Sequence, residues 1–192
     1  MYGTSWMNMV DVGLLLLRLV VGGLLMAHGA QKLFGWFGGH GIAGTGQWME
    51  SMGMRPGALF ASMAGAGEFF GGLLIALGFL NPLGPVAVIA VMAMAWAKAH
   101  WGKPIFVTEG GAELPLTNIA AALMVAFAGP GFYSLDHWFG ISVPAAIVAL
   151  AAIGAAATVV MGAMMRPAAA PAMREVPREQ RREEEEPLRR AA

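Results

Sequence analysis

Two ionised side chains, Arg18 and Glu68, interrupt long apolar stretches of this sequence. A charge at mid-membrane costs roughly 2.5 to 3.5 kcal/mol on insertion scales, so each side chain needs a buried partner or a polar cavity. Counted from His28 and Ala58, the expected cytoplasmic ends of their helices, each lies about ten residues in, roughly 15 Å deep. Equal depth on consecutive antiparallel helices predicts an ion pair between Arg18 and Glu68.

Such a pair has two interpretations. It could lock the register of the helices and do nothing else. Alternatively, it could orient a ligand or relay a proton in a cavity, because ionisable residues inside a membrane are functional candidates by default. The glycines around Glu68, among them Gly67 and Gly71, allow another helix to approach closely and fit either interpretation.

A second set of polar side chains is expected at the cytoplasmic ends of the helices. His28, Gln31 and Lys32 have i, i+3 and i+4 spacing, so they share one helix face. On the same side, Lys98 and His100 end the third apolar helix, and Asn118 begins the fourth. Any one lysine is explained by snorkelling to lipid phosphates. Their convergence over a buried charge suits an anionic or carbonyl-bearing head group.

A short segment between the first two apolar stretches accompanies this polar set. In "TGQWMESMGM", residues 45–54, the side chains of Trp48, Met49 and Met52 fall close together on one helical face. Such a pattern is typical of a short helix at the membrane surface. We expect it to lie over the polar side chains.

The sequence contains no cysteine. This excludes disulfides, thiolate metal sites and cysteine-ligated iron–sulfur clusters. His28 and His100 could approach each other, but no third ligand with suitable spacing is evident, and no metal site is predicted. Redox chemistry would therefore need a bound cofactor or a partner protein.

The composition is that of an integral membrane protein, since 57% of the 192 residues are hydrophobic and 12% are charged. The zero net charge gives no indication of a nucleic-acid partner. Five apolar stretches predict an all-α protein that crosses the lipid bilayer, and they cover residues 12–27, 58–80, 82–97, 115–128 and 141–165. The fourth is the shortest, at roughly 21 Å against a hydrocarbon core of about 30 Å.

The loop cations indicate an orientation in the cell's inner membrane. With five spans, Lys32, Arg55, Lys98 and Lys103 all fall on one side. The positive-inside rule places that side in the cytoplasm and the amino terminus outside. Residues 166–192 combine proline, alanine and charge without apolar periodicity, which predicts a disordered cytoplasmic tail.

Five separated motifs occur in an order that matches a known family. They are LLLLRLVVGGLLMAHGAQKLFG (residues 14–35), GEFFGGLLIALGFL (67–80), AKAHWGKP (97–104), GGAELPL (110–116) and GPGFYSLD (129–136). In this order they resemble the membrane domain of the DoxX family. The resemblance implies a four-helix DoxX-like domain over residues 11–136. The apolar stretch over 141–165 predicts an additional transmembrane helix beyond that domain, and it and the tail are departures from the family pattern.

Some members of that family are subunits of thiosulfate:quinone oxidoreductase or of other membrane oxidoreductase complexes. The polar positions of the family's motifs match Arg18, His28, Lys32, Glu68, His100 and Glu113 of this sequence. The resemblance implies a quinone-facing or accessory subunit of a membrane oxidoreductase, with quinone as ligand and a redox subunit as partner. The residues alone leave open a non-enzymatic binder or transporter of a small anionic or lipidic ligand, an assembly factor, or a purely structural bundle.

Both lines of reasoning give one set of candidate residues for ligand binding or proton relay. They are Arg18, His28, Lys32, Glu68, Lys98, His100, Glu113 and Asn118. Whether the protein is an enzyme stays open, because no electron donor is evident in the sequence.

Overall fold

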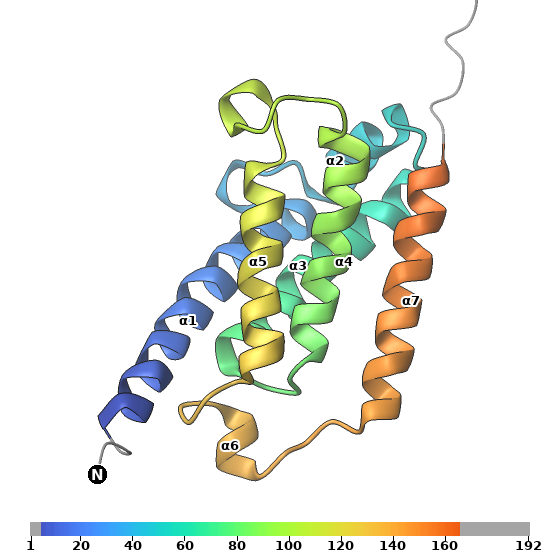
Figure 1. Cartoon of the computed structure of the whole chain (residues 1–192). Helices are drawn as coiled ribbons and strands as arrows, with labels where there is room; N and C mark the ends of the chain where they lie inside the picture. The colour runs from blue at the N-terminus through green and yellow to red at the C-terminus, as the bar shows by residue number, and fades with distance from the viewer. Residues whose placement is uncertain (1–4, 166–192) are drawn as a thin grey trace, which may run out of the picture.

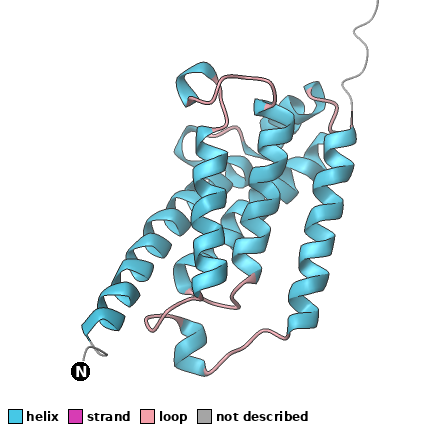
Figure 2. Ribbon diagram, in the orientation of Figure 1, coloured by secondary structure: helices cyan, strands magenta, loops and turns pink. Residues whose placement is uncertain are grey.

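In the computed structural model of the chain, residues 5–165 are described. They form helices joined by turns and loops, and no strand occurs among them (Figures 1 and 2). The prediction of an all-α protein is confirmed. The predicted disordered tail, residues 166–192, lies outside the described residues.

Five long helices make up the body of the structure, and successive long helices run in opposite directions (Figure 1). They are α1 (Ser5–Phe34), α3 (Gly57–Leu77), α4 (Leu83–Ala95), α5 (Glu113–Ala128) and α7 (Ala145–Met164). A π-helical turn, η2 (Trp96–His100), continues α4. The short elements between them are η1 (Trp36–Gly38), α2 (Gly41–Ser51), η3 (Val107–Glu109) and α6 (Leu135–Phe139).

Four segments are long and apolar enough to cross a membrane. They are Met9–Phe34, Gly57–Leu77, Leu83–His100 and Ala145–Met164. The fourth predicted stretch forms α5, an apolar helix of 16 residues that is about 24 Å long. A full crossing by α5 stays a prediction, because the hydrocarbon core of a bilayer is about 30 Å thick.

The short elements lie at the two ends of the long helices (Figure 1). We call one end the α2 end, where α1, α4 and α7 finish and α3 and α5 begin. The opposite end, which carries α6, is the α6 end. The predicted loop cations belong to segments at the α2 end, as the five-span interpretation requires. Which end faces the cytoplasm stays a prediction.

Helices α1 and α3 pack against each other at close range because glycines face the partner helix. A Cβ atom on Gly22 would lie 2.5 Å from the carbonyl oxygen of Gly72, and one on Gly29 would lie 2.5 Å from the amide nitrogen of Phe69. Small residues of this kind let helix backbones approach within a membrane. They also fix the register of the two helices, with Gly22 beside Gly72 and Gly29 beside Gly65.

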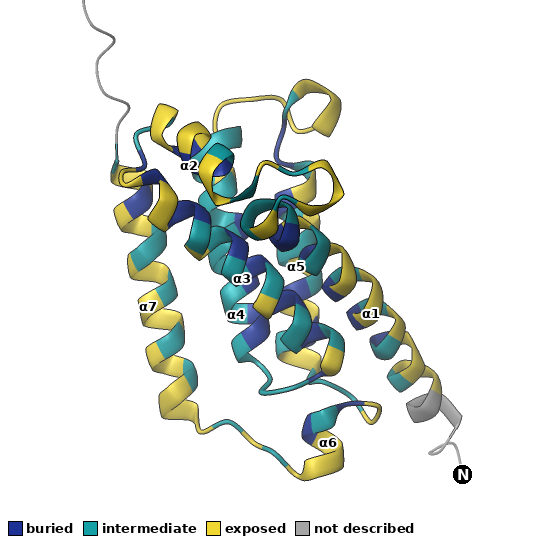
Figure 3. Cartoon of the chain, turned by 180° about the vertical axis from the view of Figure 1, so that it is seen from behind, coloured by how far each residue is buried: buried dark blue, intermediate teal, exposed yellow. Residues whose placement is uncertain are grey.

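The apolar core joins four of the long helices. Its buried residues come from α1, α3, α4 and α5, and they are Leu25, Ile75, Val88, Met92 and Ala122. Helix α7 is different, because it packs on α4 and leaves most of its surface exposed (Figure 3). Lys98 Nζ, at the end of α4, donates a hydrogen bond of 2.5 Å to the carbonyl oxygen of Met165, just after α7.

Candidate functional site

The predicted ion pair between Arg18 and Glu68 is wrong. In the observed register, α1 residues near His28 lie beside Glu68, whereas Arg18 lies beside Gly78 at the end of α3. The prediction counted depth from His28 and Ala58, but α1 runs on to Phe34, so those two residues are not level. Arg18 and Glu68 are therefore about ten residues apart along the helix pair, roughly 15 Å.

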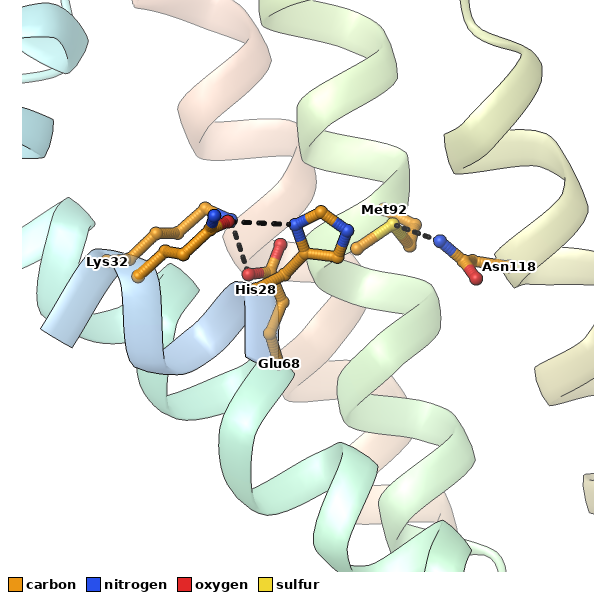
Figure 4. Close-up of polar contacts among 6 residues, drawn as sticks. His28, Lys32, Glu68, Met92 and Asn118 are labelled. Atoms are coloured by element: carbon orange, nitrogen blue, oxygen red, sulfur yellow. Dashed lines mark hydrogen bonds and ion pairs between the residues drawn. The ribbon is translucent and has the colours of Figure 1, made fainter. Parts of the chain in front are cut away.

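Glu68 instead forms an ion pair and hydrogen bond with Lys32, one helical turn beyond His28 on α1. Figure 4 shows the two side chains pointing toward each other with His28 beside them. The Glu68 side chain is 5% exposed and that of Lys32 is 24% exposed, so the pair lies at the edge of the helix bundle rather than in free solvent. His28 Nδ1 donates to Gln31 Oε1 at 3.2 Å, and Gln31 Nε2 donates to the carbonyl oxygen of Phe37 at 3.2 Å.

A cavity of about 510 Å³ opens beside this ion pair. Its walls come mainly from alanine, valine, leucine and methionine side chains of α3, α4 and α7. Six of the eight candidate residues line it, and they are His28, Lys32, Glu68, Lys98, His100 and Asn118. The structure thus brings together, from α1, η2 and α5, polar side chains that the sequence placed at one end of the bundle, and it adds Glu68 of α3, which the sequence placed deeper in the membrane.

The polar side chains from η2 and α5 are held by specific contacts. His100 Nδ1 donates to the carbonyl oxygen of Gly110 at 2.6 Å, which ties η2 to the loop before α5. Asn118 Nδ2 contacts Met92 Sδ at 3.7 Å, and Figure 4 shows this pair across from His28 and Glu68. A π-helical turn shifts the side chains that follow it around the helix axis and is frequent at functional sites. Here it carries Lys98 and His100 at the cavity.

Glu113 lies apart from this cavity. It begins α5, and its carboxylate accepts a hydrogen bond of 2.9 Å from the backbone N–H of Val107. Its position fits a role in holding the loop that contains η3 against the start of α5.

Arg18 lies apart as well, at the α6 end, where it is fully buried. Its guanidinium donates to the carbonyl oxygens of Pro130 and Tyr133, which belong to the loop between α5 and α6. The end of α3 approaches the guanidinium so closely that a side chain on Gly78, which has φ +60°, would overlap it. Arg18 therefore joins α1 to the loop and to the end of α3.

Sequence reasoning missed Asp136 as the acidic group of this region. Asp136 is buried, and its carboxylate accepts hydrogen bonds from the backbone N–H groups of Leu80 at 2.8 Å and Asn81 at 2.7 Å. It also lies close enough to Arg18 for electrostatic attraction. The signal was present in the motif GPGFYSLD, which ends at Asp136.

The methionine-rich side of the cavity was predicted in part. The segment expected to form a short helix contains most of α2, and Trp48, Met49 and Met52 line the cavity together with the polar residues. Met54, Met63 and Met94 line it too, although nothing in their spacing singled them out. Flexible thioether side chains adapt to irregular apolar ligands.

Among residues 5–165, no group of three or more histidine, aspartate, glutamate or cysteine side chains could hold a metal ion. The arrangement at the cavity can instead donate hydrogen bonds from lysine, histidine and amide groups, and it has one carboxylate beside them. It can bind a polar head group next to an apolar wall.

Comparison with known proteins gives two matches. The family model described as DoxX matches residues 13–101. The inner membrane protein YqjF of Escherichia coli (strain K12) is 32% identical over 127 residues, which cover 66% of this chain and 92% of the relative. No solved structure matches the chain.

Proposed function

Because this chain belongs to the DoxX family of multi-pass inner membrane proteins, we propose that it binds an amphipathic ligand with a quinone head group. It would do so as the quinone-facing or accessory subunit of a membrane oxidoreductase complex. The single observation that carries this proposal is the cavity in which apolar walls meet the Lys32–Glu68 ion pair.

The donor groups at the cavity suit a quinone. Quinone carbonyl oxygens accept hydrogen bonds, and the ammonium of Lys32 and the amide of Asn118 can donate them. Nε2 of His28 can donate as well when the imidazole is protonated, since Nδ1 already donates to Gln31. A volume of about 510 Å³ falls within the range of small-molecule sites. The apolar walls around these few polar groups are the usual composition of such sites.

A bound quinone would supply the electron-accepting chemistry, and its reduction consumes protons. His28 can act as a proton donor and acceptor, and Glu68 lies beside it. Lys32 keeps the carboxylate of Glu68 oriented at the cavity wall. The electrons would come from a partner subunit, because a cysteine-free chain cannot carry a thiol relay or a cysteine-ligated cluster.

The test is extraction of the full chain in mild detergent, followed by mass spectrometry of the lipids and proteins that co-purify. Wild type is compared with Glu68→Gln, which removes the negative charge of the carboxylate at the cavity. Glu113→Gln is the matched control, because that carboxylate binds a loop amide away from the cavity.

We expect wild type and Glu113→Gln to retain a quinone or a redox subunit and Glu68→Gln to lose most of it. A wild-type protein that carries only bulk phospholipid would contradict the proposal. It would favour the alternative, a non-enzymatic binder or transporter of a small anionic or lipidic ligand or an assembly factor, which transport and assembly assays would then address.

A further inference from the structure

The cavity does not end at the polar side chains. It continues between α4 and α7 along an apolar surface that we call the α7 groove, lined by Leu83, Ala87 and Ala90 of α4 and by Ala151, Ala155 and Thr158 of α7. Met63 of α3 contributes to the same cavity. The polar residues and the groove are therefore parts of one continuous space.

The groove is long and apolar. On α4 the groove runs from Leu83 to Ala90, about 10 Å along the helix axis, and the cavity continues from there to the polar side chains at η2. Thr158 is the polar residue of its α7 wall, and its hydroxyl donates to the carbonyl oxygen of Gly154 at 2.8 Å within the same helix. With that hydroxyl satisfied, the groove offers apolar contacts along its length. This shape matches a hydrocarbon chain better than a compact solute.

Helix α7 forms a side wall rather than part of the core. Within the described residues it packs mainly on α4 and the η2 turn. It is fastened at the α2 end, where Lys98 binds the carbonyl oxygen of Met165 and Met94 fills the space that a Cβ on Gly162 would take. Its other faces are exposed (Figure 3), which would place them against lipid in a membrane. The matched family segment ends at residue 101, before this wall.

We propose that the α7 groove binds the hydrocarbon chain of the ligand whose head group lies at the Lys32–Glu68 pair. The chain passes in from the bilayer between α3 and α7. The inference rests on the proposed function for the head group, and it adds a chain-binding site with α7 as its specificity-determining wall. The shared chemistry is a polar head with one long apolar chain, whether isoprenoid or acyl.

The test uses the full chain in nanodiscs and equilibrium binding of three probes. They are a dimethoxybenzoquinone with a decyl chain, the same ring with a methyl group in place of that chain, and dodecanoate. Ala155→Phe fills the groove, and Ala156→Phe adds the same side chain to the exposed face of α7. Thermal unfolding of both variants verifies folding, and Ala151→Leu is a second, smaller obstruction of the groove.

We expect Ala155→Phe to lower the affinity for the decyl probe about tenfold, which corresponds to the loss of roughly two buried methylene groups. The methyl probe should bind both phenylalanine variants as it binds wild type. If Ala155→Phe and Ala151→Leu bind the decyl probe as tightly as wild type does, the proposed chain-binding site in the groove is wrong, while the proposed head-group site is not contradicted.

If wild type binds dodecanoate but neither quinone, and Ala155→Phe no longer binds dodecanoate, the chain-binding site is supported and the proposed quinone function is wrong. If wild type binds none of the three probes, both the chain-binding site and the proposed quinone function are wrong.

Discussion

At the scale of single residues, Arg18 and Glu68 each have their own partners, and the two are not paired with each other. Glu68 is neutralised by Lys32, which reaches in from the α2 end. Arg18 is held by two backbone carbonyls and by the nearby Asp136 at the α6 end. A guanidinium presents five donors in a rigid fork, which suits it to two carbonyls at once.

This separation predicts how Lys32 and Glu68 variants behave. Glu68→Leu or Lys32→Met alone leaves an unpaired charge at the cavity and should cost about 3 kcal/mol in the free energy of unfolding. The double variant removes both charges and should recover most of that loss. Denaturation of the purified protein in detergent measures the three values. Additive losses in the double variant would mean that the two residues do not interact.

At the scale of elements, Gly22 and Gly23 of α1 should differ in how much stability is lost on substitution by alanine. Gly22 faces α3, whereas Gly23 has no atom of another residue close to the position of its Cβ. A Cβ on Gly22 would meet the Gly72 oxygen at 2.5 Å, and backbone cannot move aside without separating the helices. Gly22→Ala should therefore cost about 1 to 3 kcal/mol of stability. Thermal unfolding in detergent is the measurement.

The adjacent residue supplies the control. A Cβ on Gly23 has nothing within 4 Å, so Gly23→Ala should leave stability unchanged or raise it by about 0.5 kcal/mol through helix propensity. Equal effects of the two substitutions would show that the close approach of α1 and α3 does not limit stability.

At the scale of the whole molecule, the structure has two distinct ends, and the loop cations predict that the α2 end faces the cytoplasm. The cysteine-free sequence allows a direct test with single cysteines. Trp138 on α6 is 82% exposed and Trp101 after η2 is 74% exposed. On intact cells, a membrane-impermeant maleimide should label Trp138→Cys at once and Trp101→Cys only after permeabilisation.

The reverse labelling pattern would invert the orientation and place the Lys32–Glu68 pair near the outer surface. Labelling of both cysteines in intact cells would show that the two ends of the helices do not lie on opposite sides. The result also bears on the proposed redox partner, because a subunit that delivers electrons to the cavity would have to reach the α2 end, where its polar side chains lie.

The sequence by itself determined the helical segments and the gathering of polar side chains at one end. Apolar stretches of sufficient length must become helices in lipid, and polar side chains at their ends must collect where consecutive antiparallel helices finish. These arguments need only residue type and position along the chain. Five of the candidate residues that these arguments gathered at one end line one cavity, and they are His28, Lys32, Lys98, His100 and Asn118.

Tertiary structure alone decided which charges meet and what surrounds them. Pairing depends on the register of α1 and α3, which is set by contacts of Gly22 and Gly29 with backbone atoms. Arg18 is satisfied by carbonyls of a loop more than a hundred residues away, and a backbone carbonyl has no signature in the sequence. The same holds for the cavity, since its α7 wall exists only because α7 packs on α4 beside the other residues that line it.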